Sequence, residues 1–325
     1  MINKLFNFFL KYNFKLPWFL FSYLKVNIFI FKNKFNIIYR TNLEYKWTKT
    51  FVNYYRKKEV IDELTKGLGE NEAIYIKTYL EKIKYVNENN LLEYKKCFNN
   101  ENERIRKDFL YSYFEYKNDD IFKNIECYNN LYFIPKCLDN LGLKTDENTD
   151  ILDCGGYIGD SGIVFSNYYE KSKVHVFEPD CKNFQSLKEN IIKYNKVGKI
   201  FAINNAVGKQ TGKGYIDGNG AGANINNING KEINIISIDE YVNSNGLNPT
   251  IIKWDIEGFE YESVLGAIET IKKFRPTLFI SIYHTGKDFF EIKPLIESLG
   301  LGYKFQFDRW NANTIFSDIV LICYR

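Results

Sequence analysis

The sequence predicts an α/β protein with a doubly wound, mostly parallel sheet of seven strands, preceded by a mainly helical accessory region. Two observations support this fold class. After residue 150, short runs rich in Ile, Val and Phe alternate with helical stretches, the pattern of a parallel sheet with helices on both faces. Between residues 44 and 123, apolar residues recur with a helical period.

Composition and charge indicate a globular protein with more than one structural unit. The chain has 325 residues, of which 45% are hydrophobic and 26% are charged. The net charge of +4 is too small to indicate a nucleic-acid partner, and we expect none. The six cysteines form no CxxC pair, which favours a reducing, cytoplasmic compartment over a zinc site or a disulfide framework.

We divide the chain into a basic aromatic N-terminal segment (1–43), a helical accessory domain (44–144) and an α/β domain (145–325). The first segment has no acidic residue before Glu44, and Lys25 interrupts an apolar run that is shorter than the roughly 20 residues a bilayer needs. No small-residue cleavage site follows that run, so we expect no signal peptide. Two interpretations stay open: the segment lies on the inner, anionic surface of a membrane, or its aromatic residues cover the core of an N-terminal domain.

The accessory domain is predicted to be helical and to carry no chemistry. Over residues 71–86, Ala73, Ile76, Leu80 and Ile83 share one face of a helix. Residues 89–117 continue as helix, with a break near Asn99. For 129–143 we expect a short strand, a turn that starts at a proline, and a connecting helix.

The α/β domain follows in order. Strands are expected at 151–154, 174–178, 200–203, 250–255, 277–283, 303–307 and 319–323. Helices are expected at 161–169, 181–194, 260–272 and 289–298. Only a loop joins the last two strands, so the final strand should run antiparallel. Residues 213–238 read as an inserted hairpin, whose Gly/Asn-rich tip at 218–230 could close over a pocket.

The first strand-to-helix turn, "ILDCGGYIGDSG" (151–162), stands where doubly wound folds bind nucleotides. Its glycines allow a close approach of the backbone, and the amides that open the next helix face the ligand. Asp153 and Asp160 flank the glycines and would repel a pyrophosphate, and the spacing differs from G-x-G-x-x-G. An NAD-dependent oxidoreductase is therefore disfavoured, whereas a cationic or donor-rich ligand fits.

Two more carboxylates are predicted at the same edge of the sheet. Glu178, in "VHVFEPD", ends the second strand, where a carboxylate can accept both hydroxyls of a ribose. Asp255, in "IIKWDIEGFE", ends the fourth strand. Crowding Asp153, Glu178 and Asp255 together is unfavourable unless a cation or a donor-rich ligand lies between them. S-adenosylmethionine, which has a sulfonium, an ammonium group and a ribose, meets this requirement.

These pieces, with "INNAVGKQTGKGYI", "IISIDEYV" and "RPTLFISIYH", give a chain that resembles the FkbM family of S-adenosylmethionine-dependent methyltransferases over roughly residues 145–325. The resemblance implies the class I methyltransferase fold, with its last strand antiparallel. It departs where many members have D-V-G-A-N-x-G and this chain has Cys154, Gly156 and Tyr157. The residues expected to bind the cofactor are Asp153, Gly155, Gly156, Tyr157, Gly159, Asp160, Ser161, Glu178, Pro179, Asn205 and Asp255.

The resemblance also implies O-methylation of a natural product or of a sugar in a bacterial surface polysaccharide, with S-adenosylhomocysteine as the second product. A hydroxyl needs a base, or a metal, when it attacks the methyl group. His284 ends the fifth strand at the ligand edge and is one candidate base; Asp255 is the other, either as a base or as an oxygen ligand of a divalent cation. No metal site is assigned.

For the acceptor we expect contacts with Glu257, Tyr283, Arg309, Trp310, Asn311 and Asn313. The loop "DRWNANT" (308–314) offers a Trp face that could stack on a pyranose, and Arg and Asn side chains that could bond it. The alternative is a polar hairpin whose Trp packs on a neighbouring helix. A second functional hypothesis is a non-catalytic scaffold of a glycan assembly complex, which would keep Glu178 and the glycines without a use for His284 or Asp255.

Overall fold

The computed structural model describes four single residues and six ranges, and the structural statements below concern these alone: Phe51, Tyr54, Glu101 and Ile105, and residues 57–88, 128–143, 149–217, 224–226, 230–310 and 318–325. The predictions for segment 1–43, for Asn311 and Asn313, and for most of 89–117 and of the tip at 218–230 lie outside the described residues. From Phe51 onward the described residues belong to one compact unit.

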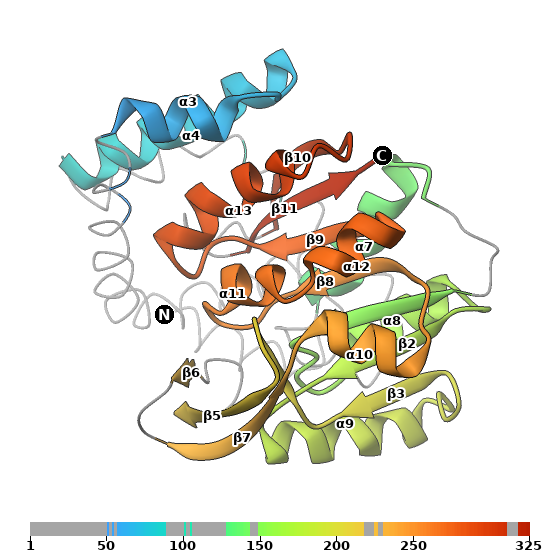
Figure 1. Ribbon diagram of the computed structural model, residues 1–325. Helices are drawn as coiled ribbons and strands as arrows, with labels where there is room; N and C mark the ends of the chain where they lie inside the picture. The colour runs from blue at the N-terminus through green and yellow to red at the C-terminus, as the bar shows by residue number, and fades with distance from the viewer. Residues whose placement is uncertain are drawn as a thin grey trace, which may run out of the picture. The chain divides into compact units, whose positions relative to one another are not determined.

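The central sheet has the seven predicted strands (Figure 1). They are β1 (Asp150–Cys154), β2 (Lys173–Phe177), β3 (Ile200–Ile203), β8 (Pro249–Trp254), β9 (Thr277–Ser281), β10 (Lys304–Arg309) and β11 (Ile319–Tyr324). Their order is β10-β11-β9-β8-β1-β2-β3. The strand β11 is antiparallel to both β9 and β10, whereas β1 is parallel to β2 and β8. The predicted fold class, with its final antiparallel strand, is confirmed.

Alternation of side chains along the strands divides the core between the two faces of the sheet. Ile151, Val174, Ile251 and Phe279 face a core that they share with the buried residues of three helices. These helices are α7 (Tyr128–Asn140), α8 (Asp160–Tyr168) and α9 (Cys181–Lys193). The helices later in the chain are α10 (Ile238–Asn245), α11 (Glu260–Leu265), α12 (Ile268–Phe274) and α13 (Gly286–Ser298), and α12 packs on β8.

The predicted inserted hairpin belongs to a small second sheet of order β4-β7-β5-β6. Its strands are β4 (Ala206–Val207), β5 (Gly212–Asp217), β6 (Asn224–Asn226) and β7 (Lys231–Ile236). A small apolar cluster of Ala206, Ile216, Ile233 and Ile235 lies between these strands. The helix α10 that follows was missed by sequence reasoning, although Ser237 and Glu240 have the spacing of a capping box and the Ser237 side chain accepts from the Glu240 N–H.

Two helical predictions need correction. Residues 128–140 form the continuous helix α7 with Pro135 inside it, not a strand and a turn, because Phe133, Ile134 and Leu138 are fully buried there and this burial offsets the roughly 3 kcal/mol cost of an interior proline. The predicted helix 260–272 is two helices, α11 and α12. At the break, a Cβ on Gly266 would lie 2.1 Å from the carbonyl oxygen of Gly208, so the backbone approaches too closely for any other residue.

The first helices among the described residues are α3 (Lys58–Thr65) and α4 (Glu70–Glu88). Of the predicted apolar face of α4, Ile76, Leu80 and Ile83 are buried and Ala73 is half-buried. Aromatic contacts join the residues that precede the sheet to α13. The ring centroid of Phe51 lies 4.6 Å from that of Phe289 in α13. Among the described residues, no helix combines the length and the apolar character that crossing a membrane requires.

Candidate active site

The turn after β1 is built on a buried ion pair. The Asp153 side chain is fully buried and accepts from Ser161 Oγ at 2.6 Å. Its other oxygen lies 3.1 Å from Nζ of Lys253, which stands beside it on β8 in the parallel register. Burial lowers the pKa of Lys253, but the carboxylates of Asp153, Asp255 and Asp160 outweigh this and raise its pKa above the ordinary value.

This pair changes the expectation of charge crowding drawn from the sequence. The chain itself supplies a cation between Asp153 and Asp255, the ammonium of Lys253. Sequence reasoning missed this residue. The signal was a lysine in the buried strand "IIKW", where an unpaired ammonium would be too costly. Asp153 was expected to bind the cofactor; in the structure its carboxylate links β1 to α8 and β8.

The glycine turn fits tightly between neighbouring strands. Gly155 has φ 83°, and a Cβ there would lie 1.9 Å from the carbonyl oxygen of Asp255. A Cβ on Gly156 would lie 1.9 Å from Val176. Tyr157 follows with φ 47°, a left-handed conformation that is uncommon for a residue with a side chain. The first glycines are therefore required by the packing of the turn, and the chain then bends into α8.

Glu178, just after β2, is tied to this turn. Its Oε2 accepts from the Tyr157 N–H at 2.9 Å, and its Oε1 accepts from the Asp180 N–H at 2.9 Å and from the Asn183 amide at 3.4 Å. Burial raises the pKa of Glu178 to about 7, although these donors act to lower it. A carboxylate has about four lone-pair sites, so Oε2 keeps one for a ligand hydroxyl.

The other predicted cofactor residues follow β1, β2 and β3 in the chain. Gly159, with φ 92°, precedes α8, which opens with the buried residues Asp160 and Ser161. Pro179 is half-buried beside Glu178, and Asn205 is half-buried just after β3. Asn204, which sequence reasoning did not select, donates through its side-chain amide to the carbonyl of Glu178 at 2.8 Å.

The turn after β8 carries the second group of predicted residues. Asp255 and Glu257 are partly exposed, with 28% and 33% of their side chains accessible. Glu257 has φ 57° and Gly258 has φ 100°. Glu260 closes the turn from the start of α11: its fully buried carboxylate accepts from the N–H groups of Ile256 and Gly258 at 2.8 and 2.9 Å.

His284 and Tyr283, just after β9, meet this turn. His284 Nδ1 lies 2.8 Å from Glu260 Oε1, and its Nε2 lies 3.8 Å from Asp255 and 3.6 Å from Glu257. The Tyr283 hydroxyl donates to Asp255 at 3.2 Å. Burial lowers the pKa of His284, but the three carboxylates outweigh this and raise it to about 10. The ring is therefore an imidazolium at neutral pH.

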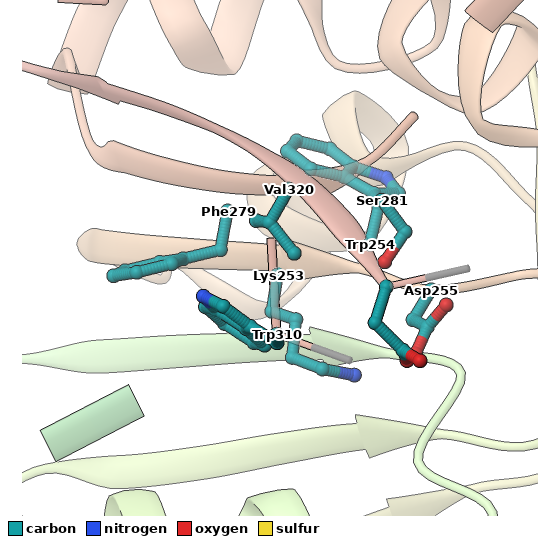
Figure 2. Close-up of a pocket in the computed structure, with 8 residues that line it drawn as sticks. Lys253, Trp254, Asp255, Phe279, Ser281, Trp310 and Val320 are labelled. Atoms are coloured by element: carbon teal, nitrogen blue, oxygen red, sulfur yellow. The ribbon is translucent and has the colours of Figure 1, made fainter. Parts of the chain in front are cut away.

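A small pocket opens beside this cluster, at the ends of β8, β9 and β11 (Figure 2). It is lined by Lys253, Trp254, Asp255, Phe279, Ser281, Trp310, Asp318 and Val320. Asp318 precedes β11 and has φ 58°. Thus Tyr157, Glu257 and Asp318 all have a left-handed backbone at one edge of the sheet. Such strain is concentrated at binding and catalytic sites.

Arg309 and Trp310, which were expected to bind the acceptor, are both buried. Arg309 is fully buried, and its Nε lies 3.1 Å from Glu101. Trp310 is 4% exposed and stacks on Phe133 of α7, with ring centroids 5.6 Å apart. The stacking on Phe133 favours the alternative in which Trp310 packs on a helix. Residues missing from the prediction, Glu260 and Lys253, are the ones that organise the site.

Ligand atoms of Asp255, Glu260 and His284 lie within 4.8 Å of one another, as in groups that hold a metal ion. The two oxygens of Glu260 already accept from backbone N–H groups, and one of them also faces His284. The imidazolium form of His284 has no lone pair for a cation. These partners make the cluster a poor cation site, and we assign no metal to it.

Comparisons with known proteins agree with this architecture. Residues 153–307 match the family model described as the methyltransferase FkbM domain. The structure of methyltransferase FkbM from Methylobacillus flagellatus KT aligns with a TM-score of 0.56 and 20% identity, over 84% of this chain and 60% of that chain. An rRNA methylase from Streptococcus thermophilus aligns with a TM-score of 0.36 and 15% identity, over 58% of this chain and 93% of that chain. None of the curated proteins matches the chain.

The fold and the acidic ligand edge thus define the class I methyltransferase architecture. Within that class, residues 153–307 of this chain are a methyltransferase domain of the FkbM family. The chain spans about 60% of the length of the Methylobacillus protein. At 20% identity, that likeness shows a shared fold and leaves the substrate to be argued from the site.

Proposed function

We propose that this chain is an S-adenosylmethionine-dependent O-methyltransferase that methylates a hydroxyl of a sugar or a sugar-linked group in bacterial surface polysaccharide biosynthesis. The main support for this cofactor comes from Glu178, a buried carboxylate just after β2. Its Oε2 accepts from the Tyr157 N–H of the glycine turn and can accept one more hydrogen bond. This is the position at which doubly wound folds bind a ribose.

The charge at the ligand edge supports the same cofactor. Asp255 is partly exposed there, and a sulfonium with an ammonium group would compensate its charge. When bound, S-adenosylmethionine supplies an electrophilic methyl group. The chain itself would hold the ribose at Glu178 and present carboxylates to the acceptor hydroxyl, which donates a proton as it is methylated.

The acceptor class rests on the family resemblance and on the chemistry of this edge. Carboxylate oxygens accept hydrogen bonds from hydroxyl groups, and Asp255, Glu257 and Asp318 offer several such oxygens close together. A sugar, which carries many hydroxyls, suits this surface better than an apolar acceptor. The test is transfer of tritium-labelled methyl from S-adenosylmethionine to a panel of methyl glycosides and nucleotide-linked sugars. Tight cofactor binding without transfer to any of them would favour the scaffold hypothesis.

Glu178 gives the first quantitative prediction. Glu178→Ala removes the ribose acceptor and should weaken S-adenosylmethionine binding by about 1.5–3 kcal/mol, the range for hydrogen bonds to a charged group. Isothermal titration calorimetry measures this, with Glu189→Ala as the control because Glu189 lies exposed on the same helix that follows Glu178. Equal affinity of the Glu178 variant and wild type would remove the ribose assignment.

A further inference from the structure

The starting point is the buried contact between Glu260 and His284. Glu260 is fully buried and bonds the backbone of the turn after β8, so its position fixes that turn. The same carboxylate lies 2.8 Å from His284 Nδ1. A buried carboxylate on Nδ1 fixes the orientation of an imidazole ring, and it leaves Nε2 of His284 facing the ligand edge.

Carboxylates surround His284 from several elements. Asp255 and Glu257 face it from the turn after β8, Glu260 from α11, and Asp288 interacts with it from α13. Each favours the charged ring, and an imidazolium has no lone pair with which to accept a proton. His284, one of the two bases expected from the sequence, is thus held in the form that cannot act as one.

The remaining carboxylates differ in what already binds them. Asp153 is paired with Lys253, and Glu260 accepts from backbone N–H groups and lies 2.8 Å from His284 Nδ1. Asp255 accepts the Tyr283 hydroxyl. No hydrogen bond from another described residue to the Glu257 carboxylate is found, and one third of its side chain is accessible.

The backbone holds Glu257 in place. Its φ of 57° is left-handed, and Gly258 follows with φ 100° and with Thr285 3.3 Å from where a Cβ would be. A strained residue with a side chain persists only where its surroundings fix it. In this turn the Glu260 carboxylate bonds the N–H groups on either side, those of Ile256 and Gly258.

We propose that Glu257 is the general base for the methyl transfer proposed above, and that the Glu260–His284 ion pair is the positioning unit that holds its carboxylate at the ligand edge. In the transfer, the acceptor oxygen bonds to the methyl carbon as the methyl–sulfur bond breaks, its electron pair stays on sulfur, and the hydroxyl proton moves to Glu257. Positive charge on sulfur and negative charge on the carboxylate disappear together, so the step balances.

The proton affinity of Glu257 suits this role. Burial raises the pKa of Glu257 to about 7; His284 lowers it, whereas Asp255, Glu260 and Asp318 add to the increase. A base is most effective when its pKa lies near the working pH. After transfer, Glu257 is partly exposed and can release the proton to water.

The first arm of the test uses the two histidines of the chain as probes and needs no acceptor. With 13C-labelled histidine, His175→Gln identifies the His284 signal in the NMR spectrum. We expect that signal to stay in the protonated form through pH 8, with a small inflection near pH 7 as Glu257 ionises. Glu257→Gln should remove the inflection, and Glu260→Gln should lower the His284 midpoint by about 1–3 pH units.

The second arm measures methyl transfer to the member of the glycoside panel that accepts it. Glu257→Gln should lower kcat by at least about 10²-fold, remove the rise in rate through pH 7, and leave the Kd for S-adenosylmethionine unchanged by calorimetry. His284→Gln should lower kcat less and keep a rise in rate with pH. Glu262→Gln, on the exposed side of α11 in an ion pair with Lys287, is the matched control and should behave as wild type.

Two results would overturn the inference while the proposed function stands: Glu257→Gln retaining the rate and pH profile of wild type, or a His284 signal that titrates to the neutral form near pH 6.5. Should the rise in rate disappear in His284→Gln and persist in Glu257→Gln, His284 is the base. Absence of transfer to every sugar in the panel counts against the proposed function, and hence against any base for it. Glu257→Asp, which keeps the charge, tests whether a loss in Glu257→Gln comes from misfolding.

Discussion

At the scale of single residues, Lys253 and Gly155 determine what the opening turn can be. Lys253 supplies a buried positive charge to Asp153, so the strand-terminal aspartate needs no ligand to compensate it. Gly155 lies against the Asp255 carbonyl, which brings the turn after β1 close to the turn after β8. The two halves of the site, around Glu178 and around His284, are thereby joined through backbone contact.

Gly155 can be tested against a glycine with a similar backbone. Gly155→Ala places a Cβ 1.9 Å from a carbonyl oxygen, in addition to the strain of φ 83°. Gly198 has φ 81° with open space around it, so Gly198→Ala should cost only about 1–2 kcal/mol of unfolding free energy. We expect Gly155→Ala to cost clearly more and to weaken S-adenosylmethionine binding. Urea denaturation and calorimetry check both; equal costs would mean that the close approach is unimportant.

At the scale of elements, helix α7 is the unit whose form depends most on its neighbours. It contains Pro135, and its buried face packs against α8 and against Trp310 at the end of β10. The parallel stacking of Phe133 and Trp310, with 5° between the ring planes, covers one face of the indole, and Trp310 is 4% exposed. Trp310, which was expected to bind the acceptor, is thus part of the core.

The Phe133–Trp310 contact gives an element-scale prediction. Phe133→Ala and Trp310→Ala should each lower the unfolding free energy by about 3–5 kcal/mol, because both side chains are buried. In the double variant, a coupling of about 0.5–1.5 kcal/mol should appear if the stacked pair acts together. Urea denaturation of the four proteins measures it. If Trp310→Ala kept wild-type stability but raised only the acceptor KM, Trp310 would bind the acceptor after all.

At the scale of the whole molecule, the carboxyl groups of the site lower stability as pH rises toward 7, whereas the contribution of His284 is lost only as pH rises through about 10. Burial raises the pKa of Glu178 and Glu257 to about 7 and that of Asp288 to about 6. The carboxylates around His284 also raise its pKa to about 10. In each case the folded state binds protons more tightly than the unfolded state, so these groups contribute stability that is present at low pH and lost as pH rises.

For Glu257 the direction of the change in stability with pH follows from its raised pKa. Its contribution is complete below its ordinary value of 4.5 and is lost as pH rises through about 7. Glu257→Gln, which cannot ionise, should therefore resemble wild type in stability near pH 4 and exceed it at pH 8. Thermal unfolding of both proteins from pH 4 to pH 8 tests this, with Glu262→Gln expected to follow the wild-type curve. A gain that is the same at every pH would contradict burial of the Glu257 carboxylate as the cause.

The sequence by itself determined the strands of the central sheet, their alternation with helices, the antiparallel last strand and the carboxylates that directly follow β2 and β8. These features could be predicted because each is local: apolar runs, turn glycines and strand-terminal carboxylates are visible within a few positions. Helix α7 shows the limit, since the local proline signal indicated a turn and long-range burial produced a helix.

Only the tertiary structure decided how these residues work. Asp153 and its partner Lys253 are separated by 100 positions, and the parallel register that pairs them is set by the whole sheet. The charge of His284 depends on carboxylates from three elements. The position of Trp310 depends on its contact with Phe133 of α7, a helix that precedes the sheet. Desolvation and contacts across the sheet set these properties, and no local pattern contains them.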